Sequence, residues 1–279
     1  MERELKRRRW IVRRKIDGWS NSTIADHLRI SERTVIRWFN AYRSNGWSGL
    51  ETKSRKPHTT HETLPEIVDN VLKIRRNHEY GPNKIEAELR RQGISLSHTT
   101  IHKILVKEGL NNPIENPRKT WGKKRFERDH SNSLWQADFK LTEDDRWMIT
   151  YLDDHSRFVA GCKINLDATG ENAIKLLEKA VRRYGNPAQI LTDRGAQFLN
   201  PRGGVTGFEQ FCLDNRIEHI TASKRRPTTI GKVERWHKTY NDEHGKFKTL
   251  HRFVRYYNYE RISQAIGYLT PAEVYFRDR

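Results

Sequence analysis

Apolar side chains recur at helical spacing in two blocks of the first 110 residues. The first block, residues 21–39 (NSTIADHLRISERTVIRWF), predicts two short helices packed across a tight turn. The second block, residues 64–105, predicts three helices that are interrupted by the turn residues GPN and QG. We therefore expect two all-α modules, residues 1–50 and residues 60–110, the second with or without a wing.

After Leu134 the pattern changes to short runs of aromatic, β-branched and apolar residues, which are typical of strands. Three such runs are followed by a helix, a further strand and a helix that begins near Lys232, which predicts a mixed α/β plan. The expected elements are strands at 134–142, 146–154, 157–166 and 188–193 and a helix at 169–184. Residues 131–248 would form this α/β domain, with a helical tail at 249–279.

The first block resembles a helix-turn-helix, in which the second helix enters the major groove of DNA. Ser31 is placed to cap that helix, and Arg33, Thr34 and Arg37 would face outward to reach DNA. Arg29 stands at a turn position where the motif usually has glycine, which predicts a looser turn. Any three-helix bundle gives the same periodicity, so the pattern alone leaves that alternative open.

The charge of the chain favours a polyanionic partner. Among 279 residues, 53 Lys and Arg stand against 35 Asp and Glu, a net charge of +18. Residues 1–130 hold 29 of the basic and 16 of the acidic residues, a net +13. Nucleic acid or an acidic membrane surface would suit such a chain. Residues 111–130 predict a basic linker that lies along phosphates, with Lys123, Lys124 and Arg125 as contacts.

No segment has the apolar length of a membrane span, the N-terminus lacks a signal peptide, and only two cysteines occur. We expect a cytoplasmic protein with no membrane partner.

Three acids occupy chemically informative places in the predicted α/β domain. Asp138 lies within a strand among apolar neighbours, Asp193 ends a strand, and Glu234 lies on the last helix. A carboxylate among apolar residues is costly unless it meets a cation or strong donors, and carboxylates are the ligands that Mg²⁺ prefers. The three acids could converge on such an ion. Taken alone, Glu234 could instead pair with Lys238 four residues later.

The segments WQADF, DDHSRF, TDRGAQF, PTTIGKVERWH and YNYER…LTPAEVY occur in this order. Together they resemble the DDE transposases of prokaryotic insertion sequences, whose catalytic core is similar to retroviral integrases and has a ribonuclease H-like fold. By position, Asp138, Asp193 and Glu234 correspond to the catalytic triad of that family, with 54 and 40 residues in the two gaps. Asp153 and Asp154 in YLDDHSR are alternative candidates for catalytic acids, but their place at a strand end is more typical of residues that cap a turn.

The resemblance implies a multidomain enzyme with tandem helix-turn-helix modules before the ribonuclease H-like domain. It implies two Mg²⁺ ions on the triad, with Mn²⁺ as a substitute, and DNA phosphates held by Lys232, Arg235 and Lys238. The implied partners are the terminal inverted repeats of an element, target DNA and further copies of the chain, at least as a dimer.

Three alternatives to an active transposase fit parts of the same sequence. A non-catalytic DNA-binding regulator would need the N-terminal modules alone, and a decayed transposase copy is suggested by Arg194, Thr228 and Ile230, which depart from the family pattern. A structure-specific nuclease would share the metal site without joining DNA ends.

Overall fold

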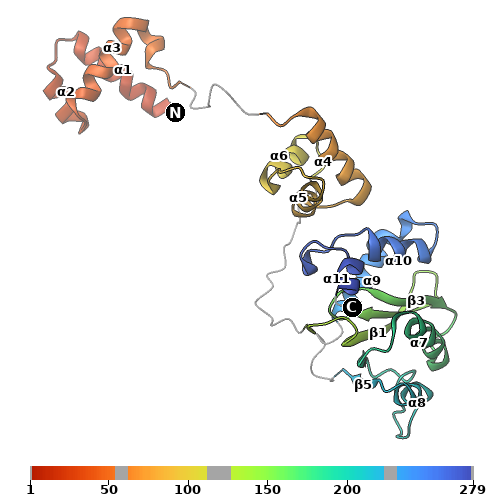
Figure 1. Cartoon of the computed structure of the whole chain (residues 1–279). Helices are drawn as coiled ribbons and strands as arrows, with labels where there is room; N and C mark the ends of the chain where they lie inside the picture. Colours follow the sequence, from red (N-terminus) through yellow and green to blue (C-terminus); the bar gives the residue numbers. More distant parts are fainter. Residues whose placement is uncertain (1, 54–61, 112–126, 223–230, 278–279) are drawn as a thin grey trace. The chain divides into compact units, whose positions relative to one another are not determined.

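The structure is a computed structural model that describes residues 2–53, 62–111, 127–222 and 231–277 (Figure 1). The chain divides into two compact units, Met1–Thr63 and Leu64–Arg279. None of the helices in the described ranges is long and apolar enough to cross a membrane.

The N-terminal unit is a small helical bundle. It consists of α1 (Glu2–Ile16), α2 (Asn21–Leu28), α3 (Glu32–Asn45) and the 3₁₀ helix η1 (Gly46–Leu50). The two predicted helices are present as α2 and α3, and the side chain of Ser31 accepts from the N–H of Thr34 at 3.3 Å to cap α3. The sequence reasoning missed α1, whose Ile11 completes a core with Ile24 and Val35.

The turn between α2 and α3 is tight, so the prediction of a looser turn was wrong. Arg29 adopts the left-handed conformation with φ of 50°. Its N–H bonds the carbonyl of Asp26, and the N–H of Ile30 bonds the carbonyl of Ala25 at 2.9 Å. These bonds satisfy the last carbonyls of α2, which offsets the modest cost of a side chain at positive φ.

The second unit begins with a three-helix module, which we call the second helical module (residues 64–110). It contains α4 (Pro65–His78), α5 (Pro82–Arg91) and α6 (His98–Lys107), as predicted, and Ser97 caps α6. The described residues 62–111 contain no strand, so no wing is present within them.

A five-stranded sheet follows, with β1 (Leu134–Leu141), β2 (Trp147–Asp153), β3 (Val159–Asn165), β4 (Gln189–Thr192) and β5 (Glu218–Thr221) in the order β3-β2-β1-β4-β5. The first three strands are antiparallel, whereas β4 and β5 run parallel to β1. The mixed sheet is thus confirmed, and β5 is an addition to the predicted strands.

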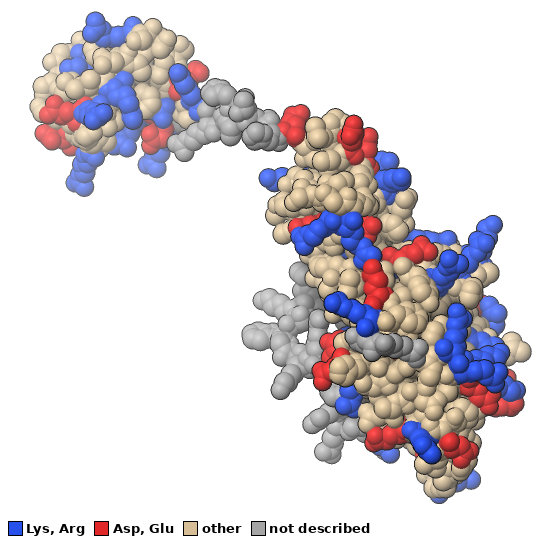
Figure 2. Space-filling view, viewed as in Figure 1, with Lys and Arg blue, Asp and Glu red and all other residues tan. Residues whose placement is uncertain are grey.

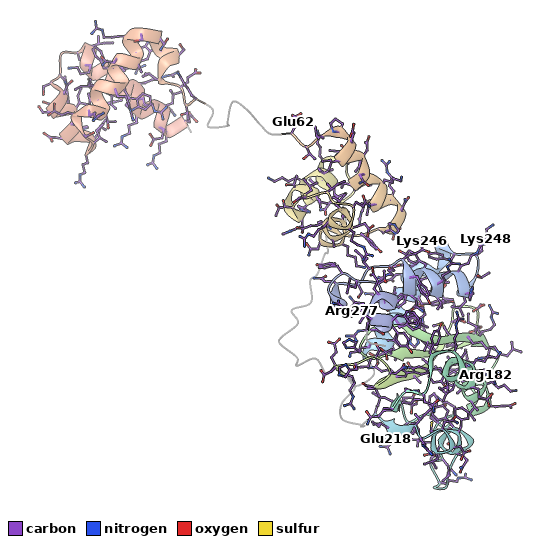
Figure 3. The ribbon with its side chains drawn as sticks, in the orientation of Figure 1. Glu62, Arg182, Glu218, Lys246, Lys248 and Arg277 are labelled. Carbon is purple, nitrogen blue, oxygen red and sulfur yellow. The ribbon has the colours of Figure 1, made fainter. Side chains whose placement is uncertain are left out.

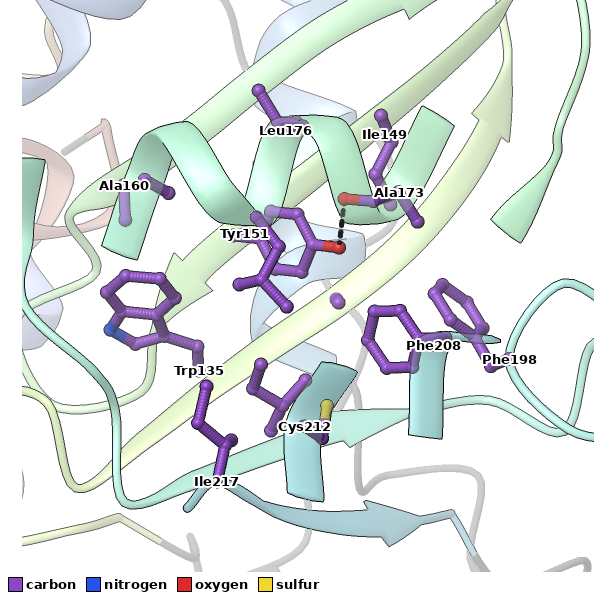
Figure 4. Close-up of a cluster of buried hydrophobic side chains, with 14 of the residues drawn as sticks. Trp135, Ile149, Tyr151, Ala160, Ala173, Leu176, Phe198, Phe208, Cys212 and Ile217 are labelled. Atoms are coloured by element: carbon purple, nitrogen blue, oxygen red, sulfur yellow. Dashed lines mark hydrogen bonds between the residues drawn. The ribbon is translucent and has the colours of Figure 1, made fainter. Parts of the chain in front are cut away.

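Alternate residues of the sheet face two different helical layers, as the strand period requires. Trp135, Ile149 and Tyr151 point towards α7 (Gly170–Tyr184) and α8 (Gly207–Asp214), where the hydroxyl of Tyr151 donates to the carbonyl of Ala173 (Figure 4). On the other face, Met148 and its neighbours pack against α9 (Gly231–Glu243) and α10 (Leu250–Tyr259).

The C-terminal segment joins the second helical module to the sheet domain. It contains η3 (His244–Lys246), η4 (Gln264–Ile266) and α11 (Pro271–Arg277). Ile262 of this segment lies in the apolar core of the module, and its N–H donates to the hydroxyl of Tyr80 at 3.2 Å. Lys246 (Figure 3) pairs with Glu79 at 3.0 Å. The expected boundaries at 60–110 and 249–279 therefore separate parts that the structure packs together.

Candidate active site

Neighbouring parallel strands bring two of the predicted acids together. Gln136 in β1 is paired with Leu191 in β4, and two residues further along each chain lie Asp138 and Asp193. Adjacent strands are about 4.8 Å apart and side chains alternate between faces. This register therefore directs both carboxylates to neighbouring positions on the same face. Asp193 follows the end of β4, where its Oδ1 accepts from the N–H of Gly195 at 3.0 Å.

Helix α9 covers the face of the sheet on which Asp138 lies. Its apolar side, with Val233 and Trp236, is buried, whereas Glu234 is exposed, as the helical spacing predicts. His237 lies one turn after Glu234, and its Nδ1 is 3.6 Å from Oδ2 of Asp138. Since residues three apart share one side of a helix, Glu234 borders the same site. Among the ion pairs that the described residues form, none joins Glu234 to Lys238.

The raised pKa of Asp138 indicates that the carboxylates of Asp193 and Glu234 lie near it. Burial, together with the negative charges of Asp193 and Glu234, raises the pKa of Asp138 to about 7. Burial also lowers the pKa of His237 to about 4, assisted by the charge of Lys140. The imidazole is therefore neutral at pH 7, so its contact with Asp138 is polar and not an ion pair.

The three carboxylates form an open arrangement. Over the described ranges, no three His, Cys, Asp or Glu side chains stand close enough together to hold a metal ion as they are placed. Two features of the site would favour a bound cation or donor. Asp138 lies near two like charges, and the buried Nε2 of His237 has no hydrogen-bond partner among the described residues. The metal role of the three acids stays a prediction.

Lys232 has a different partner from the DNA phosphate that we expected. Its Nζ lies 2.7 Å from Oδ2 of Asp154, a fully buried carboxylate, and also donates to the carbonyl of Asp154 at 2.9 Å. The sequence reasoning had placed Asp154 in a turn and had not connected it with α9. The two residues lie 78 positions apart, so no local pattern could have revealed the pair.

Asp153 has the turn role that the sequence reasoning preferred for it. Its Oδ1 accepts from the N–H and the hydroxyl of Ser156 at 2.8 and 2.6 Å, and its Oδ2 accepts from the N–H of Asn132 at 2.8 Å. With its oxygens engaged in this way, Asp153 closes the β2–β3 turn.

The remaining predicted DNA contacts lie in several places. Arg33 and Arg37 are exposed on α3, while Thr34 is half-buried and its Oγ1 is 3.0 Å from Oγ of Ser31. Arg235 and Lys238 are exposed on α9. The linker contacts Lys123, Lys124 and Arg125 lie outside the described residues. Basic and acidic side chains are interspersed on the face shown in Figure 2.

A cavity of about 1000 Å³ lies between β3, α7 and α10. Its lining includes Lys163, Lys179 and Arg183 but none of the three acids, so it is separate from the candidate active site.

Comparisons with known proteins agree with this fold. Residues 128–227 match the Integrase core domain family, and residues 1–51 and 34–105 match Homeodomain-like domain families. The matches place an integrase core domain after homeodomain-like helix-turn-helix domains, an organisation that implies DNA binding.

Among its relatives are transposases of mobile elements. The chain is 23% identical to the transposase for transposon Tn552 of Staphylococcus aureus, over 80% of this chain and 52% of the relative. It is 24% identical to the uncharacterized 31.7 kDa protein of insertion element IS407 of Burkholderia multivorans, over 90% of this chain and 93% of the relative. The chain is thus similar to proteins of transposons and insertion sequences, and it spans about half the length of the Tn552 transposase.

Among solved structures, the HTLV-2 integrase catalytic core domain in complex with magnesium is similar, with 19% identity and a TM-score of 0.44, over 53% of this chain and 98% of that one.

Proposed function

We propose that this chain is a DNA transposase that binds the terminal inverted repeats of its element, cleaves phosphodiester bonds at the ends and joins those ends to target DNA. The observation that most supports the proposal is the strand register that puts Asp138 and Asp193 on one face of the integrase core match, a face that is covered by α9, the helix that carries Glu234. The reaction would take place on nucleoid DNA in the cytoplasm.

The donor set suits a divalent, oxygen-preferring cation. Asp138 is held among apolar residues and two further carboxylates, so its negative charge is disfavoured without a counter-ion. We infer that Asp138, Asp193 and Glu234 would hold Mg²⁺, as two ions, with Mn²⁺ as a substitute. When bound, such ions activate the attacking oxygen and stabilise the leaving oxygen of an in-line displacement.

The residues around the acids position the polyanionic substrate. Arg235 and Lys238 are exposed on α9, one and four residues after Glu234, where they would hold phosphates next to the scissile bond. Arg33 and Arg37 on α3, with the linker residues Lys123 to Arg125, would contact the terminal repeat. Two ends must be brought together for joining, so we infer a homo-oligomer, at least a dimer.

The test is incubation of the purified chain with a duplex that ends in its own terminal repeat, with Mg²⁺ or Mn²⁺, and separation of the products on a denaturing gel. Wild type should yield cleaved and joined strands. Glu234→Gln should bind the duplex but lower the rate at least about 100-fold. Asp242→Asn, an exposed acid on the same helix, is the matched control and should retain activity.

Each product pattern has a separate meaning. Cleavage without joining would replace the proposal by a structure-specific nuclease. Binding without either product in wild type would replace it by a regulator or a decayed copy. Equal activity of wild type and Glu234→Gln would remove Glu234 from the reaction.

A further inference from the structure

A buried polar cluster connects β1, the end of β2 and the first turn of α9. At its centre is the carboxylate of Asp154, which is fully buried. Its Oδ1 accepts from Nε2 of Gln136 at 2.8 Å. Its Oδ2 accepts from the N–H of Arg128 at 2.9 Å and lies 2.7 Å from Nζ of Lys232. Both carboxylate oxygens therefore have strong donors, as a buried charge requires.

The same cluster satisfies the start of α9. The first N–H groups of a helix have no partner within the helix. The N–H of Val233 is one of them, and it donates to Oε1 of Gln136 at 3.2 Å. The negative charge of Asp154 also lies at this positive end of the helix dipole. The amide of Gln136 thus links Asp154 to α9 with both of its polar atoms.

The members of the cluster are adjacent in sequence to the acids of the candidate active site. Gln136 precedes Asp138 by two residues on the same face of β1, and Val233 directly precedes Glu234. The hydrogen bond from the N–H of Val233 to the side chain of Gln136 therefore links the backbone next to Glu234 to the strand that carries Asp138. The β1–β4 register already sets the relative positions of Asp138 and Asp193. The link from Gln136 to Val233 therefore determines the position of Glu234 relative to both.

We propose that Asp154, Lys232 and Gln136 are positioning residues, which hold the first turn of α9 so that Glu234 faces Asp138 and Asp193. Because Asp154 is buried and bonded within the protein, the cluster would act on the rate through Glu234. This inference rests on the proposed function, whereas the link itself can be measured without any reaction.

The experiment uses the full chain and four proteins: wild type, Asp154→Asn, the double variant Asp154→Leu with Lys232→Met, and the control Arg261→Met. For each one, thermal stability, amide exchange in residues 231–235, and the kcat and KM for cleavage of the terminal-repeat duplex are measured. Arg261 pairs with Glu243 at 2.9 Å at the other end of α9, with 16% and 15% of the two side chains exposed. The control therefore removes a comparable ion pair from the same helix.

Asp154→Asn should lose stability, because Lys232 is left without a counter-charge. It should also lower kcat about 10- to 100-fold with KM for DNA changed less than about threefold, as expected for a group that orients a catalytic acid. Amide exchange in the first turn of α9 should become faster by about tenfold.

The double variant separates positioning from stability. Replacing both members of a buried ion pair by apolar residues is often neutral for folding, so its melting temperature should return to within about 3 °C of wild type. The positioning role predicts that kcat stays low and that exchange in residues 231–235 stays fast. Recovery of kcat together with stability would overturn the inference, as would a fall in kcat for Arg261→Met equal to that of Asp154→Asn.

A wild-type chain that fails to cleave would overturn the proposed function. The amide-exchange measurements alone would then test whether Asp154 holds the first turn of α9. Unchanged exchange in both Asp154 variants would show that Asp154 does not hold α9, whatever the activity of the chain.

Discussion

Replacing Asp138 by asparagine should stabilise the metal-free protein at pH 8. Burial and two neighbouring carboxylates raise the pKa of Asp138 to about 7, against about 3.9 in an unfolded chain. At pH values above 7 the folded state must therefore hold a charge that the unfolded state carries at lower cost. At about 1.36 kcal/mol for each tenfold change in acidity, the penalty is at most about 4 kcal/mol. Asparagine keeps the shape without the charge, so we expect a gain of about 2–4 kcal/mol.

The sign of the pH dependence follows from the raised pKa. Below about pH 4 the carboxyl is protonated in both states and costs nothing, and the penalty grows as the pH rises from about 4 to about 7. Urea unfolding in EDTA at pH 4.5 and pH 8 measures the difference between Asp138→Asn and wild type, with Asp242→Asn as the exposed control. A variant that is no more stable than wild type at pH 8, or equally stabilised at pH 4.5, would refute the reasoning.

Three further outcomes are expected. Ile262→Ala should lower the free energy of unfolding by about 2–5 kcal/mol and speed amide exchange in the second helical module, because Ile262 is 1% exposed within its core; unchanged exchange there would indicate a module that folds independently. Arg37→Ala should weaken duplex binding and reduce the slope of log K against log salt by about one at unchanged melting temperature, and an unchanged slope would remove Arg37 from the phosphate contacts. The guanidinium of Arg91 holds the pKa of Glu273 at about 2, so the stabilisation lost in Glu273→Gln is present above about pH 4.5 and disappears as the pH falls towards 2. Because both side chains are about 40% exposed, this loss is under about 1 kcal/mol in urea unfolding at pH 7, and a difference that persists at pH 2 would contradict it.

Several features of this protein were determined by local sequence. The spacing of Val233, Trp236 and Tyr240 sets the buried side of α9, and it leaves Glu234 exposed beside that buried side. Ser31 caps α3 because its side chain reaches an N–H three residues later. Such features were predictable because helix and strand periods depend on residues that are close in sequence. Asp138 was likewise recognisable as unusual, because its neighbours in the same strand are apolar.

Other features depended on the path of the chain. The sequence suggested that Lys232 would bind phosphate, but β2 ends beside the first turn of α9, and Lys232 meets a buried Asp154 there. The sequence also separated the second helical module from the C-terminal tail, although Ile262 completes the core of that module. A buried charge pairs with the nearest opposite charge and an apolar side chain joins the nearest core, whatever the distance along the chain. Only the tertiary structure decides which groups are nearest.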